Sequence, residues 1–196
     1  EDMHDSVVEM YRTTVDYYVD NIIKDKQAAA DWDYTLLNEH LLPIIPLQRI
    51  AYSADIDTKD KLKKKLFDEA LKMYESKPAE FESEEQFKEI ERVIILRAID
   101  EKWNQHIDDM DQLKQGIGLQ AFAQRDPVVE YKNVGYDIFD DMLKEIQIEV
   151  VHIISSVRPR REVELNDANK QAVAKKENTV SGHTPIVNKD KEKELV

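Results

Sequence analysis

Apolar residues between Ser83 and Val157 recur at the three- and four-residue intervals of an α-helix. In the first half of this stretch, one apolar stripe has members spaced three, four, three, four, three and four residues apart. They are Leu96, Ile99, Trp103, His106, Met110, Leu113 and Ile117. Such a narrow stripe predicts a seam along which a second helix packs. The return segment repeats the pattern with Phe139, Met142, Ile146, Val150, Ile153 and Val157.

The segment between these two patterns carries signals that break a helix. Gly116 and Gly118 weaken helical structure, and Pro127 disfavours helical geometry at the residue before it. The chain is therefore predicted to reverse between residues 115 and 127. The result is an antiparallel helical hairpin with Leu119 and Phe122 near its tip.

The rest of the chain shows shorter helical patterns. The first 26 or so residues carry two adjoining apolar stripes, which predict a helix with a wide buried face. Asp31 is predicted to cap a helix that Pro43 stops, and Thr58 to begin a helix that ends before Pro78. Ser83 has the capping-box form that begins a long helix. No strand pattern or internal repeat is evident, so the predicted fold class is all-α.

The composition of the chain disfavours several classes of function. The chain has 196 residues and a net charge of −13, and such an acidic surface disfavours binding to nucleic acid. It has no cysteine, which rules out disulfides and thiolate metal sites and fits a reducing compartment. The acidic amino terminus lacks the pattern of a signal peptide, and no apolar run approaches the roughly 20 residues of a membrane span. Any membrane role is expected to be peripheral.

Candidate chemistry is sparse. The sequence has no phosphate-binding G-x-x-x-x-G-K-[ST] loop. Two E-x-x-H pairs, Glu1 with His4 and Glu149 with His152, have the spacing that di-iron bundles use, so such a bundle is one alternative. His106 lies on the apolar seam and is interpreted as a hydrogen-bonded core histidine. The lysines at positions 61, 63, 64 and 65 lack interleaved aromatics and are interpreted as a solvated helix face.

The break between the two long helical patterns also carries a family signature. A W-x-x-H-x-x-x-M-D-x-L-x-Q-G-I-x-L run is matched by Trp103, His106, Met110, Asp111, Leu113, Gln115, Gly116, Ile117 and Leu119. An A-Q-x-D-P run is matched by Ala123, Gln124, Asp126 and Pro127. This combination resembles the two-helix finger of SecA, the motor ATPase of bacterial preprotein translocation.

The resemblance implies a domain plan. Residues 1–26 would be the first part of a helical scaffold and residues 27–82 an inserted helical wing domain. Residues 83–157 would be the second part of the scaffold with the two-helix finger, whose fingertip is residues 115–125. Residues 158–196 are polar and lack aromatics, and they are predicted to form a flexible C-terminal linker.

The resemblance also implies a role for the fingertip. Its preprotein-contacting residues would be Phe122, Leu119, Gln120, Ala121 and Gln124. The fingertip loop would also include Gln115, Gly116, Ile117, Gly118, Arg125, Asp126 and Pro127. Phe122 stands where the family usually has tyrosine, Gly118 where histidine is common, and Ala121 where glycine is common.

The partners implied are the SecYEG channel, an unfolded preprotein and the SecA motor domains, with self-association as a further expectation. The chain itself would be non-catalytic and bind no cofactor, since ATP and Mg belong to the motor domains, and its finger would help to regulate their ATP hydrolysis. Its place would be the cytoplasmic face of the bacterial plasma membrane. The alternative from a different class is a freestanding helical adaptor or oligomerisation module, in which the tip loop is only a connector.

Overall fold

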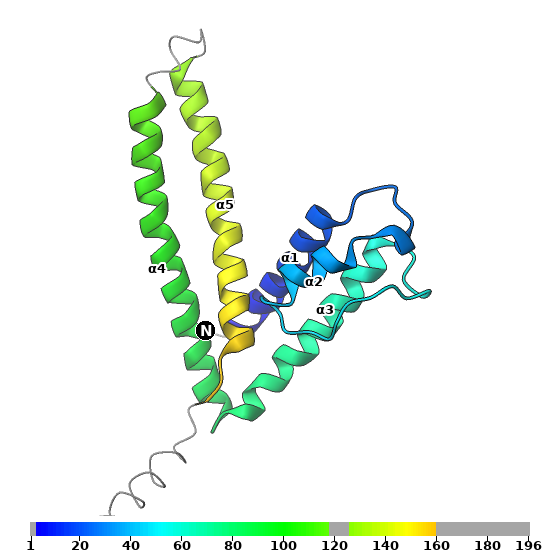
Figure 1. Ribbon diagram of the computed structural model, residues 1–196. Helices are drawn as coiled ribbons and strands as arrows, with labels where there is room; N and C mark the ends of the chain where they lie inside the picture. Colours follow the sequence, from blue (N-terminus) through cyan, green and yellow to red (C-terminus); the bar gives the residue numbers. More distant parts are fainter. Residues whose placement is uncertain (1–2, 118–125, 160–196) are drawn as a thin grey trace, which may run out of the picture. The chain divides into compact units, whose positions relative to one another are not determined.

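A computed structural model describes residues 3–117 and 126–159 of the chain, and the described part is helical without a strand. The all-α prediction is confirmed. In chain order the elements are α1 His4–Ile22, η1 Ala29–Asp31, α2 Tyr34–Leu41, α3 Lys59–Ser76, η2 Lys77–Glu80, α4 Glu84–Gly116 and α5 Pro127–Ser156 (Figure 1). Here η marks a short 3₁₀-helix.

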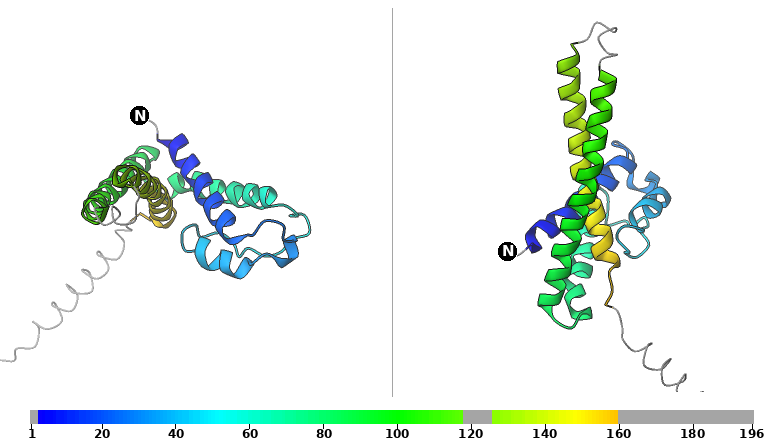
Figure 2. Two further views of the ribbon diagram at one scale, coloured as in Figure 1. Left: turned by 90° about the horizontal axis from the view of Figure 1, so that it is seen from above. Right: turned by 90° about the vertical axis from the view of Figure 1, so that its left-hand side faces the viewer.

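The two longest helices, α4 and α5, lie side by side and antiparallel, as Figure 2 shows from two directions. At 1.5 Å per residue, the 33 residues of α4 extend over about 50 Å. The buried residues of α4 end at Ala98, so its farther half has no buried core residue. The helices are therefore held mainly at their base, where α1 and η2 pack against them.

Helix α1 contacts α2, α3 and α5, which accounts for its wide apolar face. Its buried residues are Val7, Tyr11, Thr14, Val15 and Val19. Beyond α1, the asparagine Asn38 fixes the link after α2, because its side-chain amide donates to Ile50 O at 2.7 Å and accepts from Ile50 N at 2.8 Å. Helices α2 and α3 thus both pack against α1.

The helix boundaries follow their side-chain caps. The Thr58 hydroxyl accepts a hydrogen bond from Lys61 N, and the Ser83 hydroxyl accepts one from Gln86 N at 3.1 Å, so both predicted starts are confirmed. The predicted cap at Asp31 is wrong. Asp31 ends η1, and Asp33 caps α2 instead by accepting from Leu36 N at 2.9 Å. The extra turn of η1 moves the helix start by two residues.

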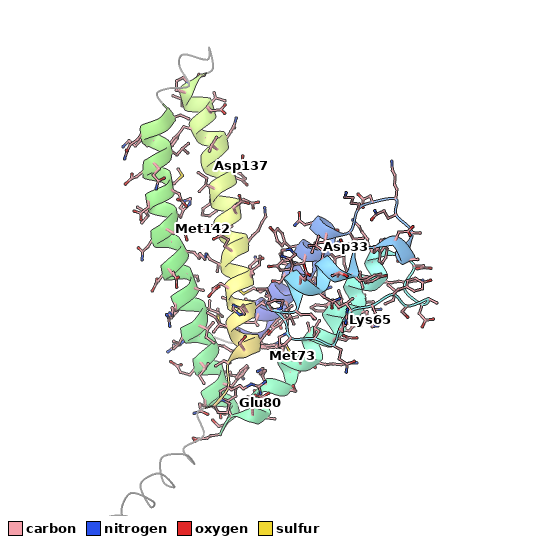
Figure 3. The ribbon with its side chains drawn as sticks, in the orientation of Figure 1. Asp33, Lys65, Met73, Glu80, Asp137 and Met142 are labelled. Carbon is pink, nitrogen blue, oxygen red and sulfur yellow. The ribbon has the colours of Figure 1, made fainter. Side chains whose placement is uncertain are left out.

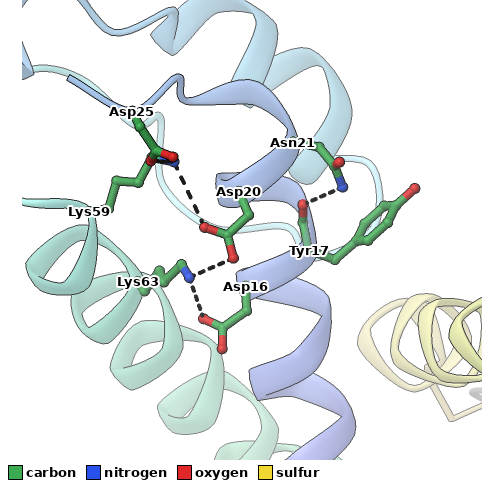
Figure 4. A network of polar contacts seen from close by, with 7 residues as sticks. All are labelled: Asp16, Tyr17, Asp20, Asn21, Asp25, Lys59 and Lys63. Atoms are coloured by element: carbon green, nitrogen blue, oxygen red, sulfur yellow. Dashed lines mark hydrogen bonds and ion pairs between the residues drawn. The ribbon is translucent and has the colours of Figure 1, made fainter. Parts of the chain in front are cut away.

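Ion pairs join α1 to the start of α3. The Lys63 ammonium lies 2.7 Å from Asp20 and 3.8 Å from Asp16, while Lys59 lies 2.7 Å from Asp25 (Figure 4). The interpretation of the lysine-rich stretch as a solvated face is therefore wrong for Lys63. Its side chain is 21% exposed, and its ammonium is paired with carboxylates of α1.

A buried polar chain of contacts joins four helices at the base of the hairpin. The hydroxyls of Tyr11 in α1 and Ser155 in α5 share a hydrogen bond of 2.8 Å. The Tyr11 ring lies 5.4 Å from the ring of Tyr74 in α3, and the Tyr74 hydroxyl donates to Glu91 of α4 at 2.6 Å. These hydrogen bonds satisfy polar groups that would each cost roughly 1–3 kcal/mol if buried alone.

We expect Tyr11 to make the fold sensitive to alkaline pH. Burial, opposed by the Ser155 hydrogen bond and supported by the charge of Glu91, raises the pKa of Tyr11 to about 12. An unfolded tyrosine ionises near pH 10, so between these values the folded state holds a proton that the unfolded state has released. The free energy of unfolding therefore falls as pH rises from 10 to 12, by up to about 2–3 kcal/mol.

Urea unfolding of the parent chain and of Tyr11→Phe between about pH 10 and 12 tests this effect. The free energy of unfolding of Tyr11→Phe should fall less steeply with pH than that of the parent chain. Tyr136→Phe is the matched control, because Tyr136 is 74% exposed. Equal slopes for the parent chain and Tyr11→Phe would contradict the prediction.

Gly135 sets the closest approach within the hairpin. A Cβ atom there would lie 3.0 Å from Met110 Cε and 3.5 Å from Met110 Sδ. Gly135→Leu should force the helices apart and lower the free energy of unfolding by about 1–3 kcal/mol. Gly135→Ala should be tolerated, because the flexible end of Met110 can shift and alanine favours the helix by about 1 kcal/mol.

Thermal unfolding measures both effects. Gly116→Leu is the control, since a Cβ atom at Gly116 meets nothing within 4 Å. If Gly135→Leu is as stable as Gly116→Leu, the helices do not approach as closely as the structure indicates.

Candidate functional site

The candidate site is the part of the hairpin farthest from the base, residues 100–117 and 126–141, which we name the distal arm. Helix α4 ends at Gly116, and Ile117 closes its last turn by donating its N–H to Leu113 O. Helix α5 begins with Pro127, and the Asp126 side chain caps it by accepting from Val128 N at 2.9 Å. The backbone of Asp126 is extended, as expected for a residue that precedes proline.

Two ordered helix ends therefore frame the predicted fingertip. Of the fingertip loop, Gln115, Gly116, Ile117, Asp126 and Pro127 fall in the described residues, with Gln115 and Gly116 exposed and Ile117 half-buried. The remaining predicted residues lie outside the described residues: Gly118, Leu119, Gln120, Ala121, Phe122, Gln124 and Arg125.

Within the distal arm, His106 lies between aromatic rings of both helices. Its ring centroid is 5.6 Å from that of Trp103 on the same helix and 5.7 Å from that of Phe139 on α5. His106 Nδ1 is buried and has no hydrogen-bond partner among the described residues. The hydrogen bond expected of a core histidine is therefore not made at this nitrogen. Farther out, Met110 and Leu113 face Gly135 of α5.

Near the base, the seam differs from the one predicted. Leu96, Ile99 and Trp103 are 55%, 40% and 48% exposed, so these three are not buried between the helices. The buried face of α4 is instead formed by Phe87, Glu91, Ile94, Ile95 and Ala98. The face continues through Lys102, whose ammonium lies 2.8 Å from Glu145 of α5. A seam containing alanine and lysine gives a weaker apolar signal than the exposed leucine, isoleucine and tryptophan beside it.

The displaced residues form an exposed apolar surface, which we name the outer face. Its members on α4 are Val93, Leu96, Ile99, Trp103 and Ile107, and those on α5 are Tyr136, Phe139 and Leu143. Helical spacing puts each set on one side of its helix, and the contacts of His106 with Trp103 and Phe139 join the two sets. A contiguous apolar surface of this kind is typical of an interaction site.

A cavity of about 200 Å³ lies between the two helices, with His106, Ile138 and Met142 among its lining residues. Lys102, Gln105, Asp109, Asp141 and Glu145 line it. The Lys102 pKa is raised by its hydrogen bond to Glu145 and by nearby carboxylates, against an opposing effect of burial. Charged side chains thus gather at this cavity, apart from the residues of the outer face.

The distal arm is strongly acidic. It contains ten Asp or Glu residues against three Lys residues, so it carries more than half of the net charge of −13. These like charges repel one another and are spread along both helices, as Asp137 on α5 illustrates (Figure 3). An arm of this charge is unsuited to phosphate backbones and favours partners that are neutral or basic.

Other chemistry receives little support. Residues 3–117 and 126–159 bring together no group of three or more histidine, aspartate or glutamate side chains that could hold a metal ion. Glu149 and His152 are half-buried on α5, while Glu1 of the other E-x-x-H pair lies outside the described residues. Among the described helices, each is too short or too polar to span a membrane.

Comparison with known proteins gives this architecture a family. The chain is 40% identical over 190 residues to the protein translocase subunit SecA of Lachnoclostridium phytofermentans, covering 92% of the chain and 21% of the relative. It is 37% identical over 197 residues to SecA 1 of Alkaliphilus metalliredigens, covering 99% of the chain and 22% of the relative. A third relative, SecA of Clostridium tetani, is 45% identical over 123 residues, covering 63% of the chain and 14% of the relative.

The chain thus spans about a fifth of the length of the first two relatives. The family model described as the SecA wing and scaffold domain matches residues 1–158, which include every described helix. The chain therefore belongs to the SecA wing and scaffold domain family.

Proposed function

We propose that this chain is the non-catalytic part of a SecA translocation motor that presents a two-helix finger to an unfolded preprotein at the SecYEG channel. The observation that carries the proposal is the form of the hairpin. Its base is held by α1 and η2, while its distal arm has no buried core residue on α4. A pair of antiparallel helices fixed at one end is suited to transmit movement along its length.

The fingertip would make the contact with the preprotein. In this proposal Phe122 contacts the passing chain through its ring, with Leu119, Gln120, Ala121 and Gln124 beside it. An aromatic ring offers apolar area at low entropic cost and makes no demand on the sequence that it touches. Because Phe122 lacks the hydroxyl of the usual tyrosine, the contact would not depend on a hydrogen bond from that group.

The outer face would receive the motor domains. Trp103 and its exposed neighbours on α4 are apolar, and they would be covered when the scaffold docks onto the domains that hydrolyse ATP. Movement of those domains would then reach the finger directly, and the same contact would allow the finger to restrain ATP hydrolysis. ATP and Mg would be bound by the motor domains, and this chain would supply no cofactor ligand.

The proposed location is the cytoplasmic face of the bacterial plasma membrane, with membrane contact only through the channel. The negative charge of the distal arm supports a protein partner and not a nucleic acid. The second candidate function is a freestanding adaptor or oligomerisation module. The exposed outer face favours it, because two copies could bury their apolar surfaces against each other.

Substituting Phe122 in the full-length protein that carries this chain separates the two functions. If the fingertip contacts the preprotein, Phe122→Ala should lower the rate of protein transport into membrane vesicles by roughly tenfold, because a truncated aromatic contact is worth roughly 1–2 kcal/mol. Phe122→Tyr keeps the ring and should retain transport. ATP hydrolysis without preprotein should continue in both variants.

Tyr52→Ala is the matched control, because it removes an exposed aromatic ring outside both the fingertip and the outer face. Normal transport by Phe122→Ala would overturn the preprotein contact. It would favour the adaptor module, in which the tip loop only connects two helices. Equal losses in Phe122→Ala and Tyr52→Ala would show that removing any exposed aromatic ring impairs transport, which would also contradict a specific fingertip role.

A further inference from the structure

Two side chains at the end of α3 contact both helices of the hairpin at its base. The Tyr74 hydroxyl donates to Glu91 Oε1 of α4 at 2.6 Å, and the Lys77 ammonium donates to the backbone oxygen of Val157, which follows α5, at 3.0 Å. The chain is continuously helical from Tyr74 to Lys77, so these residues lie three positions apart on one side. We name this pair the base anchor.

The Lys77 side chain is 3% exposed, which is unusual for an ammonium group. Its nitrogen lies 3.8 Å from Glu80 Oε2, and Arg158 lies 3.8 Å from the same carboxylate oxygen (Figure 3 labels Glu80). Burial and the charge of Arg158 lower the pKa of Lys77, while Glu80 raises it. The Lys77 ammonium lies where α5 ends, and the last carbonyl groups of a helix lack partners within it. A cation is therefore favourable at this position.

Tyr74 holds the other helix through an equally buried contact. Tyr74 and Glu91 both belong to the interior, and the Tyr74 ring lies between the rings of Tyr11 and Phe87 at 5.4 and 6.2 Å. A hydrogen bond from a hydroxyl to a carboxylate is short and strong when it is dry. The position of Glu91, and with it the base of α4, is therefore tied to α3.

In the described part of the distal arm, Lys102 forms an ion pair with Glu145 that joins α4 to α5 at 2.8 Å, but the two side chains are 23% and 53% exposed, so solvent weakens it. The arm's other contacts come from half-buried side chains such as Met110, which is flexible, and from the close approach at Gly135. Two packed helices can slide past each other when nothing directional holds them. The buried directional contacts lie at the base. Tyr11 of α1 bonds Ser155, while Tyr74 and Lys77, where α3 meets η2, bond Glu91 and the Val157 oxygen.

We infer that the wing helix α3 sets the register of the hairpin, and that the base anchor is the conformational device by which it does so. Displacing the end of α3 would break one directional contact to α4 and one to the end of α5 at the same time, since Tyr74 bonds Glu91 and Lys77 bonds the Val157 oxygen. The wing is then a positioning element for the finger and not an independent module. This inference concerns the chain by itself and holds whether or not the proposed translocation function is correct.

The test uses the chain as given, with Lys77→Met, which keeps the unbranched stem and removes the ammonium, and Tyr74→Phe, which removes one oxygen. Because the chain has no native cysteine, spin labels on introduced cysteines at the exposed positions Glu85 and Ser156 report the α4–α5 separation. Hydrogen exchange reports local opening. Matched controls are Lys88→Met, in an exposed ion pair with Glu84, and Tyr34→Phe, whose hydroxyl donates within the wing to Ala29 O.

Lys77→Met should widen the distance distribution and speed exchange of the amides in the last turn of α5 by roughly tenfold, with amides in the middle of α1 unchanged. Tyr74→Phe should widen the same distribution, and Lys77→Arg should restore it. The inference is overturned if both variants match the controls, or if exchange rises equally throughout the chain. If Lys77→Met does not fold, Tyr74→Phe decides by the same two measurements.

Discussion

The structure depends on the buried polar chain of contacts that crosses the base of the hairpin. Ser155 of α5 is hydrogen-bonded to Tyr11 of α1, whose ring packs on Tyr74 of α3, whose hydroxyl in turn binds Glu91 of α4. A hydrogen bond requires a defined direction between two groups, whereas apolar packing requires only that they lie close together. A buried polar group left without a hydrogen bond also destabilises the folded state. Four helices from distant parts of the sequence are thus held in one arrangement.

That base allows the distal arm to be built differently from the rest of the chain. The arm contains an excess of acidic residues, and Trp103, Tyr136 and Phe139 are 48%, 74% and 37% exposed. Such a surface contributes little to folding, and its like charges oppose close packing. The fold tolerates this surface because the buried contacts of the base supply the stability.

The seam of α4 shows why the sequence predicted the hairpin but misassigned one of its faces. The spacing of Leu96, Ile99 and Trp103 signals a helix with an apolar side, and that much is correct. Periodicity does not say whether an apolar side faces a neighbouring helix or a separate partner. The true contact side near the base includes Ala98 and Lys102, which a search for large apolar residues passes over.

The sequence by itself determined the helical class, the helix starts at Thr58 and Ser83, the break before Pro127 and, through the motif from Trp103 to Pro127, the family. These are local properties, because caps, proline and motif spacing act within a few residues. Only the tertiary structure decided that Lys77 is buried against the end of α5 and that Tyr74 holds Glu91. Those contacts join residues 80 and 17 positions apart, and their energy depends on burial that no local pattern specifies.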